Sequence, residues 1–95
     1  MTTASIERTE DGTRISVEGH TQPEICAAVT NLFNAVLNAL VDLDLQGVVQ
    51  ILSTKAGDGS FSLEYTGEAE QVMLVLVHGF ELLQTNFPDC FVFEG

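Results

Sequence analysis

The sequence contains very few basic residues. One lysine and two arginines stand against 14 aspartates and glutamates, and the formal net charge is −11. A charge of this sign and size repels phosphate backbones, so we do not expect binding to nucleic acid. The acidic residues have two interpretations: they keep the protein soluble, or they also attract a basic segment of a partner protein.

Cysteine and histidine are scarce as well, with two of each. Cys26 and Cys90 are too few to form a disulfide scaffold in a chain of 95 residues. The sequence has no CxxC or HxxxH pattern, and His20 and His78 are far apart along it. Neither a metal site nor a cofactor is therefore predicted.

Long apolar runs are also missing. The longest, Val72 to Val77, has six residues, whereas a membrane-spanning helix needs ~20. The first residues lack the basic start and apolar core of a secretory signal. We therefore expect a cytoplasmic protein that does not enter a membrane. A hydrophobic content of 45% with 18% charged residues predicts one globular domain over residues 1–95.

The periodicity of the apolar residues predicts an α+β domain of order ββαββαβ, with two helices packed on a mixed β-sheet. Turn residues and a proline mark the ends of its elements. In chain order these are a hairpin over residues 4–19, a helix from Pro23 to Leu43, a hairpin over residues 47–67 with its turn at 55–60, a helix over residues 67–87 that Pro88 ends, and a strand within residues 89–95.

The first predicted helix has two alternative start signals. Thr21 and Glu24 fit a capping box, whereas capping by Gln22 would place Pro23 at the first helical position.

The same helix has no charged residue from Cys26 to Val41, and asparagines mark its polar face. A fully solvated helix normally carries lysine and glutamate there. This face is therefore predicted to be partly covered, for example at a subunit contact.

The segment EGHTQPEICAAVT, residues 18–30, places a histidine just before the helix and a cysteine about one turn inside it. The free N–H groups and macrodipole of a helix N-terminus favour a thiolate, and the N–H groups can also hold a developing oxyanion. A nearby imidazole can take the thiol proton and later protonate a leaving amine. His20 and Cys26 are therefore candidates for the base and nucleophile of a thiol protease. The alternative is a loop histidine and a small buried cysteine. No third residue that would orient His20 is evident.

These residues also resemble a known family, the ribosomal-processing cysteine proteases called Prp. That family has a strand ending in Gly-His and a helix opening with Cys-Ala-Ala-Val-Ser. Gly19 and His20 match the first motif, and residues 26–29 match the second, with Thr30 in the serine position. The stretch GFELLQTNFPDCFVF is similar to the family's last helix, its exit and its final strand, with Phe87 in a tyrosine position.

The resemblance implies an α+β fold, usually a homodimer, and a Cys–His dyad. The family removes an N-terminal extension from a large-subunit ribosomal protein, and relatives process phage structural proteins. Carried over to this chain, Cys26 is the nucleophile and His20 the general base, and the protein substrate is expected to present a basic N-terminal segment.

The chain departs from the family between the two motifs. Family members usually have a longer, glycine-containing segment there, thought to be mobile and to cover the site, often with an aspartate three residues before the cysteine. Here five residues separate His20 from Cys26, and Pro23 stands in the aspartate position. The alternative function is therefore a catalytically inactive, dimeric binding or assembly module with the same fold.

Overall fold

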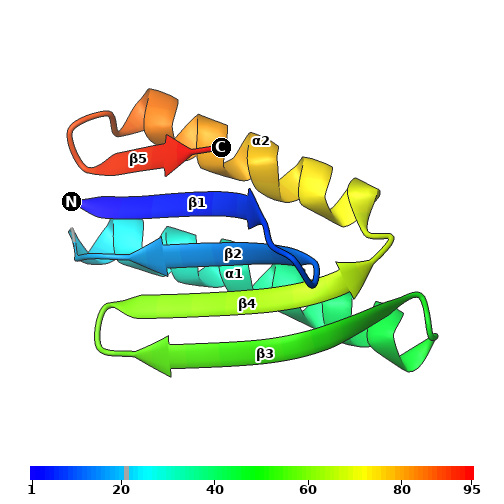
Figure 1. The fold of residues 1–95 in the computed structure, drawn as a ribbon. Helices are drawn as coiled ribbons and strands as arrows, with labels where there is room; N and C mark the ends of the chain where they lie inside the picture. The colour runs from blue at the N-terminus through cyan, green and yellow to red at the C-terminus, as the bar shows by residue number, and fades with distance from the viewer. Residues whose placement is uncertain (21) are drawn as a thin grey trace.

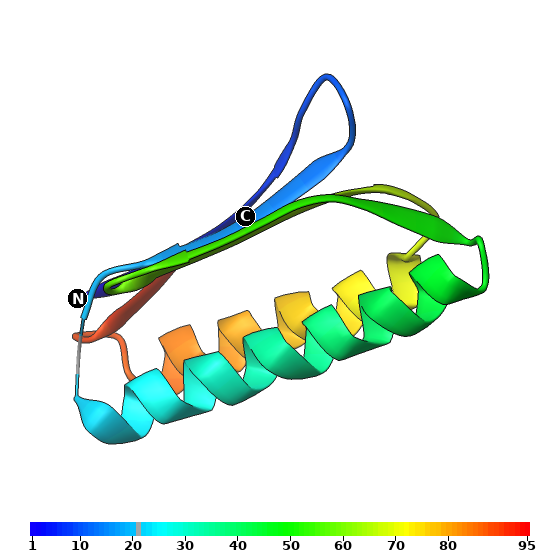
Figure 2. The same ribbon diagram turned by 90° about the horizontal axis from the view of Figure 1, so that it is seen from below.

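The computed structural model describes residues 1–20 and 22–95. Within these residues, five strands form one mixed sheet, and two helices cover one of its faces (Figures 1 and 2). The elements are β1 (Thr2–Arg8), β2 (Thr13–Glu18), α1 (Pro23–Leu45), β3 (Val49–Gly57), β4 (Ser60–Gly67), α2 (Glu70–Asn86) and β5 (Phe91–Glu94). The predicted α+β class and the order ββαββαβ are confirmed.

The strands lie side by side in the order β3-β4-β2-β1-β5. β5 runs parallel to β1, and the other neighbours are antiparallel. This order brings the start of β1, the end of β2 and the β3–β4 turn to one end of the sheet, above the start of α1 (Figures 1 and 2). Three segments far apart in sequence therefore meet beside the segment that carries the His and Cys motifs.

α1 begins as the second start signal predicts. Pro23 is its first residue, and Gln22 is the N-cap with an extended ψ of 145°. A residue before proline is disfavoured in helical dihedrals, which agrees with this start. Thr21, the other capping candidate, lies outside the described residues.

The end of α1 lies two residues beyond the predicted Leu43, at Leu45. Gly47 follows with a φ of +78°, a conformation that suits glycine and commonly ends a helix. The carboxylate of Asp44 accepts a hydrogen bond from the backbone N–H of Ile51 at 2.9 Å. Asp44 therefore ties the end of α1 to the edge strand β3.

The turn of the second hairpin is tighter than predicted. Lys55 pairs with Ser62 and Ala56 with Phe61, so β3 continues through residues that were expected in the turn. The connection between β3 and β4 is reduced to Asp58 and Gly59, and Gly59 has a φ of +74°. A positive φ is adopted readily by glycine, which explains Gly59 as the second residue of the turn.

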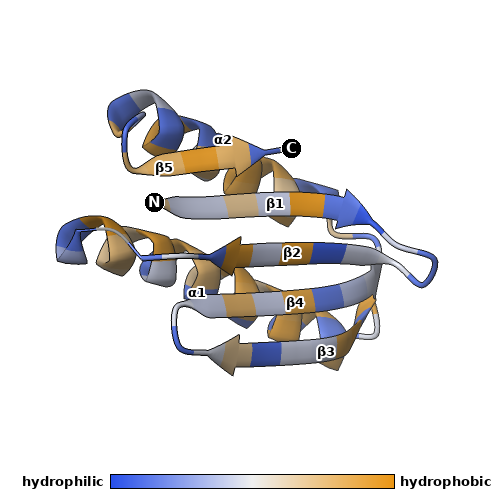
Figure 3. Cartoon of the chain, turned by 60° about the vertical axis from the view of Figure 1, so that its left-hand side comes forward, coloured by the Kyte–Doolittle hydropathy of each residue, from blue (hydrophilic) through white to orange (hydrophobic). Residues whose placement is uncertain are grey.

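The core lies between the sheet and the helices. Both helices turn an apolar face toward the sheet, and β1, β2 and β4 alternate apolar and polar residues (Figure 3). Burying this apolar surface is the main favourable contribution to folding. The buried core residues are Ala4, Ile15, Val17, Ile25, Val29, Phe33, Val36, Leu40, Val49, Leu63, Tyr65, Ala69, Leu76, Phe80 and Phe91.

α1 is long and apolar enough, by length and composition alone, to cross a membrane. Its apolar residues are explained by the fold, because Val29, Phe33 and Val36 lie buried on one stripe of the helix. The asparagines Asn31 and Asn34 are exposed on the other side. α1 therefore has the pattern of an amphipathic core helix.

Candidate active site

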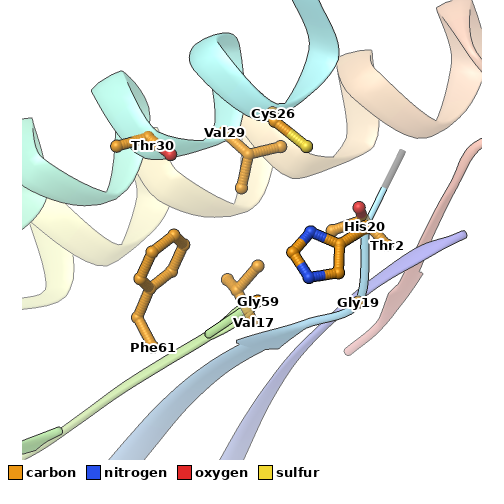
Figure 4. A pocket seen from close by; sticks show the side chains of 9 residues that line it. All are labelled: Thr2, Val17, Gly19, His20, Cys26, Val29, Thr30, Gly59 and Phe61. Carbon is orange, nitrogen blue, oxygen red and sulfur yellow. The ribbon is translucent and has the colours of Figure 1, made fainter. Parts of the chain in front are cut away.

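A cavity of about 180 Å³ opens at the end of the sheet described above, and it contains both candidate catalytic residues (Figure 4). Its walls come from the strands β1, β2 and β4, from the β3–β4 turn and from the first turns of α1. The lining residues are Thr2, Val17, Gly19, His20, Cys26, Val29, Thr30, Gly59 and Phe61. His20 and Cys26 therefore border the same cavity.

His20 reaches the cavity because Gly19 lets the chain turn out of β2. Gly19 has a φ of +104°, and a Cβ atom there would lie 2.1 Å from the carbonyl oxygen of Met1. The backbone nitrogen of Met1 donates a hydrogen bond to the carbonyl of His20 at 2.8 Å. Position 19 of the Gly-His motif therefore requires glycine, both because its φ is positive and because a side chain would collide with the backbone of Met1.

Cys26 is half-buried in the first turns of α1, and its sulfur points into the cavity (Figure 4). The backbone N–H groups of Ile25 and Cys26 both donate to the carbonyl of Gln22 at 3.0 Å, and Pro23 has no N–H. The N–H groups of Ile25 and Cys26 are therefore engaged within the first turn of the helix, and an oxyanion role for the N–H groups at this helix start stays a prediction. The helix macrodipole, which favours a thiolate near this end, remains.

The β3–β4 turn faces the imidazole, a contact that sequence reasoning missed. Asp58 Oδ1 lies 3.7 Å from His20 Nε2. A Cβ atom on Gly59 would lie 2.4 Å from the same nitrogen, so the absence of a side chain at Gly59 makes room for the ring. The Asp-Gly pair is a visible turn signal, but its place beside His20 depends on the pairing of β2 with β4, which a local pattern does not encode.

Thr2 contributes an unusual group to this cavity. Its side chain is 1% exposed, and its hydroxyl has no hydrogen-bond partner among the described residues. A buried polar group without a partner costs about 1–3 kcal/mol.

Replacing Thr2 with valine is therefore expected to raise the free energy of unfolding by about 1 kcal/mol, because the shape is kept and the unpaired hydroxyl removed. Urea unfolding measures the change, and Thr3→Val, on the half-exposed neighbour, is the matched control. A loss of stability in Thr2→Val alone would mean that the hydroxyl has a partner in solution, such as an ordered water.

One of the two arginines of the β1–β2 hairpin, Arg14, is held by acids away from the cavity. Arg14 lies 3.3 Å from both Glu7 and Glu64. The Thr9 hydroxyl, which donates to Glu64 at 2.6 Å, and the nearby Arg14 lower the pKa of that carboxyl. Because Arg14 already pairs with two carboxylates, it offers little positive charge to a partner.

No protein-family profile matches the chain, and no curated protein is similar to it in sequence. Solved structures do match. The essential ribosomal processing protease Prp from S. aureus, in complex with a covalently linked product peptide, superposes with a TM-score of 0.79 over 99% of this chain and 100% of that one. The chain has the Prp fold.

The sequence identity in that comparison is 14%. A second structure of S. aureus Prp, in complex with a substrate peptide, gives the same TM-score at 13% identity and covers 99% of this chain and 98% of that one. The likeness is thus one of fold over nearly the whole chain. It confirms the resemblance to Prp that the Gly-His and Cys-Ala-Ala-Val motifs suggest.

Proposed function

We propose that the protein is a cysteine endopeptidase of the Prp type, with Cys26 as nucleophile and His20 as general base. The observation that supports this most is the cavity that both side chains line in a Prp fold (Figure 4). The relatives of this fold were crystallised with a substrate peptide and with a covalently linked product peptide. A peptide segment of a protein is accordingly the proposed substrate.

The proposed reaction follows from the two side chains. His20 takes the proton of the Cys26 thiol, and the sulfur attacks the carbonyl carbon of the scissile peptide bond. The imidazolium then gives its proton to the leaving amine as the C–N bond breaks. The acyl group remains on sulfur as a thioester. Water, activated by His20, hydrolyses the thioester and restores the thiol.

The proposed substrate is the N-terminal extension of a large-subunit ribosomal protein in the cytoplasm or, alternatively, a phage structural protein. The net charge of −11 and the acids Glu18, Glu24 and Asp58 in segments next to the cavity support a basic substrate segment. Opposite charges speed encounter and suppress wrong partners.

The test of this function is cleavage of full-length candidate precursors from the same genome by the purified protein, followed by mass spectrometry of the products. One new N-terminus, produced by the parent and not by Cys26→Ala, would support the protease. Binding of a precursor without cleavage would favour the alternative, an inactive binding or assembly module, which the short segment between His20 and Cys26 suggests.

We also propose that the protein forms a homodimer through the outer faces of its helices. Leu74, Val75 and Leu82 of α2 are 53%, 63% and 62% exposed. Beside them runs an apolar groove between α1 and α2 that includes Ala35 and Ala39. Two chains of charge −11 repel each other, and on this apolar face of α2 the exposed acid Glu81 is paired with His78 at 3.4 Å, which reduces the repulsion there.

Light scattering of the purified protein is expected to give the mass of two chains. Val75→Glu would place a charge at the proposed contact and is expected to yield a monomer, whereas Thr54→Glu, exposed on β3, is the control. A parent protein of monomeric mass would contradict the dimer.

A further inference from the structure

The β3–β4 turn holds the only ion-pair partner of His20 in the described part of the chain. We propose that Asp58 is a positioning residue that orients the His20 imidazole and stabilises its protonated form. This inference rests on the proposed function, because it assigns Asp58 a role through the Cys26–His20 dyad.

The position of the turn relative to His20 is fixed by the backbone. The N–H of Gly19 donates to the carbonyl of Gly59 at 2.8 Å, so the residue before His20 is tied to the residue after Asp58. Gly59 itself lies against the ring, where a Cβ atom would be 2.4 Å from Nε2. The hydrogen bond between Gly19 and Gly59 therefore holds the backbone of Asp58 beside the imidazole, in addition to the contact that the Asp58 side chain makes.

The two ring nitrogens of His20 face different groups. Nε2 faces the turn, with Asp58 Oδ1 at 3.7 Å. Nδ1 lies on the opposite side of the ring, toward the start of α1, where the sulfur of Cys26 points into the cavity (Figure 4). A carboxylate beside Nε2 favours the tautomer with its proton on Nε2, which leaves Nδ1 as the base for the thiol.

Asp58 then acts during proton transfer. The S–H bond of Cys26 breaks, an N–H bond forms at Nδ1, and the ring becomes an imidazolium with its positive charge near the carboxylate. At 3.7 Å the interaction is a charge–charge attraction and not a short hydrogen bond. Other charged groups close to His20 are the amino group of Met1, which donates to the His20 carbonyl, and, along the sequence, Glu18 and Glu24.

The exposure of Asp58 limits the effect and simplifies the test. Its side chain is 101% exposed, so a substitution removes no packing, and the His20 side chain is 69% exposed. An exposed ion pair contributes little and is screened by salt. We therefore expect Asp58→Asn to slow reaction of Cys26 by about two- to fivefold at low salt.

The experiment measures the alkylation rate of Cys26 by iodoacetamide, a neutral reagent, in a Cys90→Ala background at neutral pH. The variants are Asp58→Asn, Asp58→Glu, His20→Ala, and Asp11→Asn as a control that removes the same charge from the distant β1–β2 turn. Each is measured at 0.01 M and at 1 M salt, where the Debye length falls from roughly 30 Å to 3 Å.

The proposal expects three results. At low salt, Asp58→Asn slows alkylation and Asp11→Asn does not. Asp58→Glu keeps most of the rate of the parent, the Cys90→Ala protein. At high salt, the rate of the parent falls to that of Asp58→Asn. An Asp58→Asn rate equal to the parent's at low salt, or an equal loss in Asp11→Asn, would overturn the role of Asp58. If His20→Ala slows the reaction and Asp58→Asn does not, the dyad stands without Asp58. If His20→Ala has no effect, both proposals fail.

Discussion

Replacing Cys26 with alanine is expected to abolish cleavage of the precursor, and replacing His20 with alanine is expected to slow it by about 10²–10⁴-fold. The first change removes the atom that forms the thioester, so no covalent route remains. The second leaves the thiol in place and removes the group that takes its proton and later protonates the leaving amine.

The measurement is the rate at which the new N-terminus appears, followed by mass spectrometry at fixed enzyme and precursor concentrations. Cys90→Ala is the matched control, because Cys90 lies just before β5 and does not line the cavity. Cys26→Ser tests the nucleophile with nearly the original shape. Persistent cleavage by Cys26→Ala would exclude Cys26 as the nucleophile, and full activity of His20→Ala would exclude the dyad.

The elements of this fold were predictable because their signals are local. The stripe formed by Ile25, Val29, Phe33, Val36 and Leu40 recurs at helical spacing, and each of these residues is buried. Pro23 and Pro88 mark a helix start and a helix exit in the positions that proline chemistry dictates. Several boundaries differed: β1 begins earlier than predicted, at Thr2, and α2 is shorter, Glu70–Asn86. At Gly57 and Leu45, pairing with β4 and the hydrogen bonds after α1 extend the elements.

The candidate site was predictable only where its residues are close in sequence. His20 and Cys26 could be paired from one short segment, but Asp58 could not, because the strand order places β4 beside β2 across a long stretch of chain. The requirement for glycine at position 19 likewise depends on the carbonyl of Met1, which only the folded sheet brings there. Groups that meet through long-range strand pairing leave no local pattern to detect.

Gly59 of the β3–β4 turn lies against the His20 imidazole, and a substitution there is expected to have the second large effect on cleavage. Gly59→Ala is expected to slow cleavage by about 10²-fold, because misplacing a catalytic group by about an ångström has that consequence. The new Cβ atom would stand 2.4 Å from His20 Nε2, and the exposed ring can move away more easily than the backbone of the turn.

Gly47→Ala separates this displacement from simple backbone strain. Gly47 has a φ of +78°, close to the +74° of Gly59, but a Cβ atom there meets nothing within 4 Å. Both variants should therefore lose a similar free energy of unfolding, about 1–2 kcal/mol for an alanine in a left-handed conformation. Urea unfolding checks that loss, and the precursor assay measures activity. Since the strain is matched, a cleavage rate that falls only in Gly59→Ala comes from the new Cβ atom in the cavity beside the imidazole, whereas equal rates in the two variants would show that the turn does not hold His20 in place.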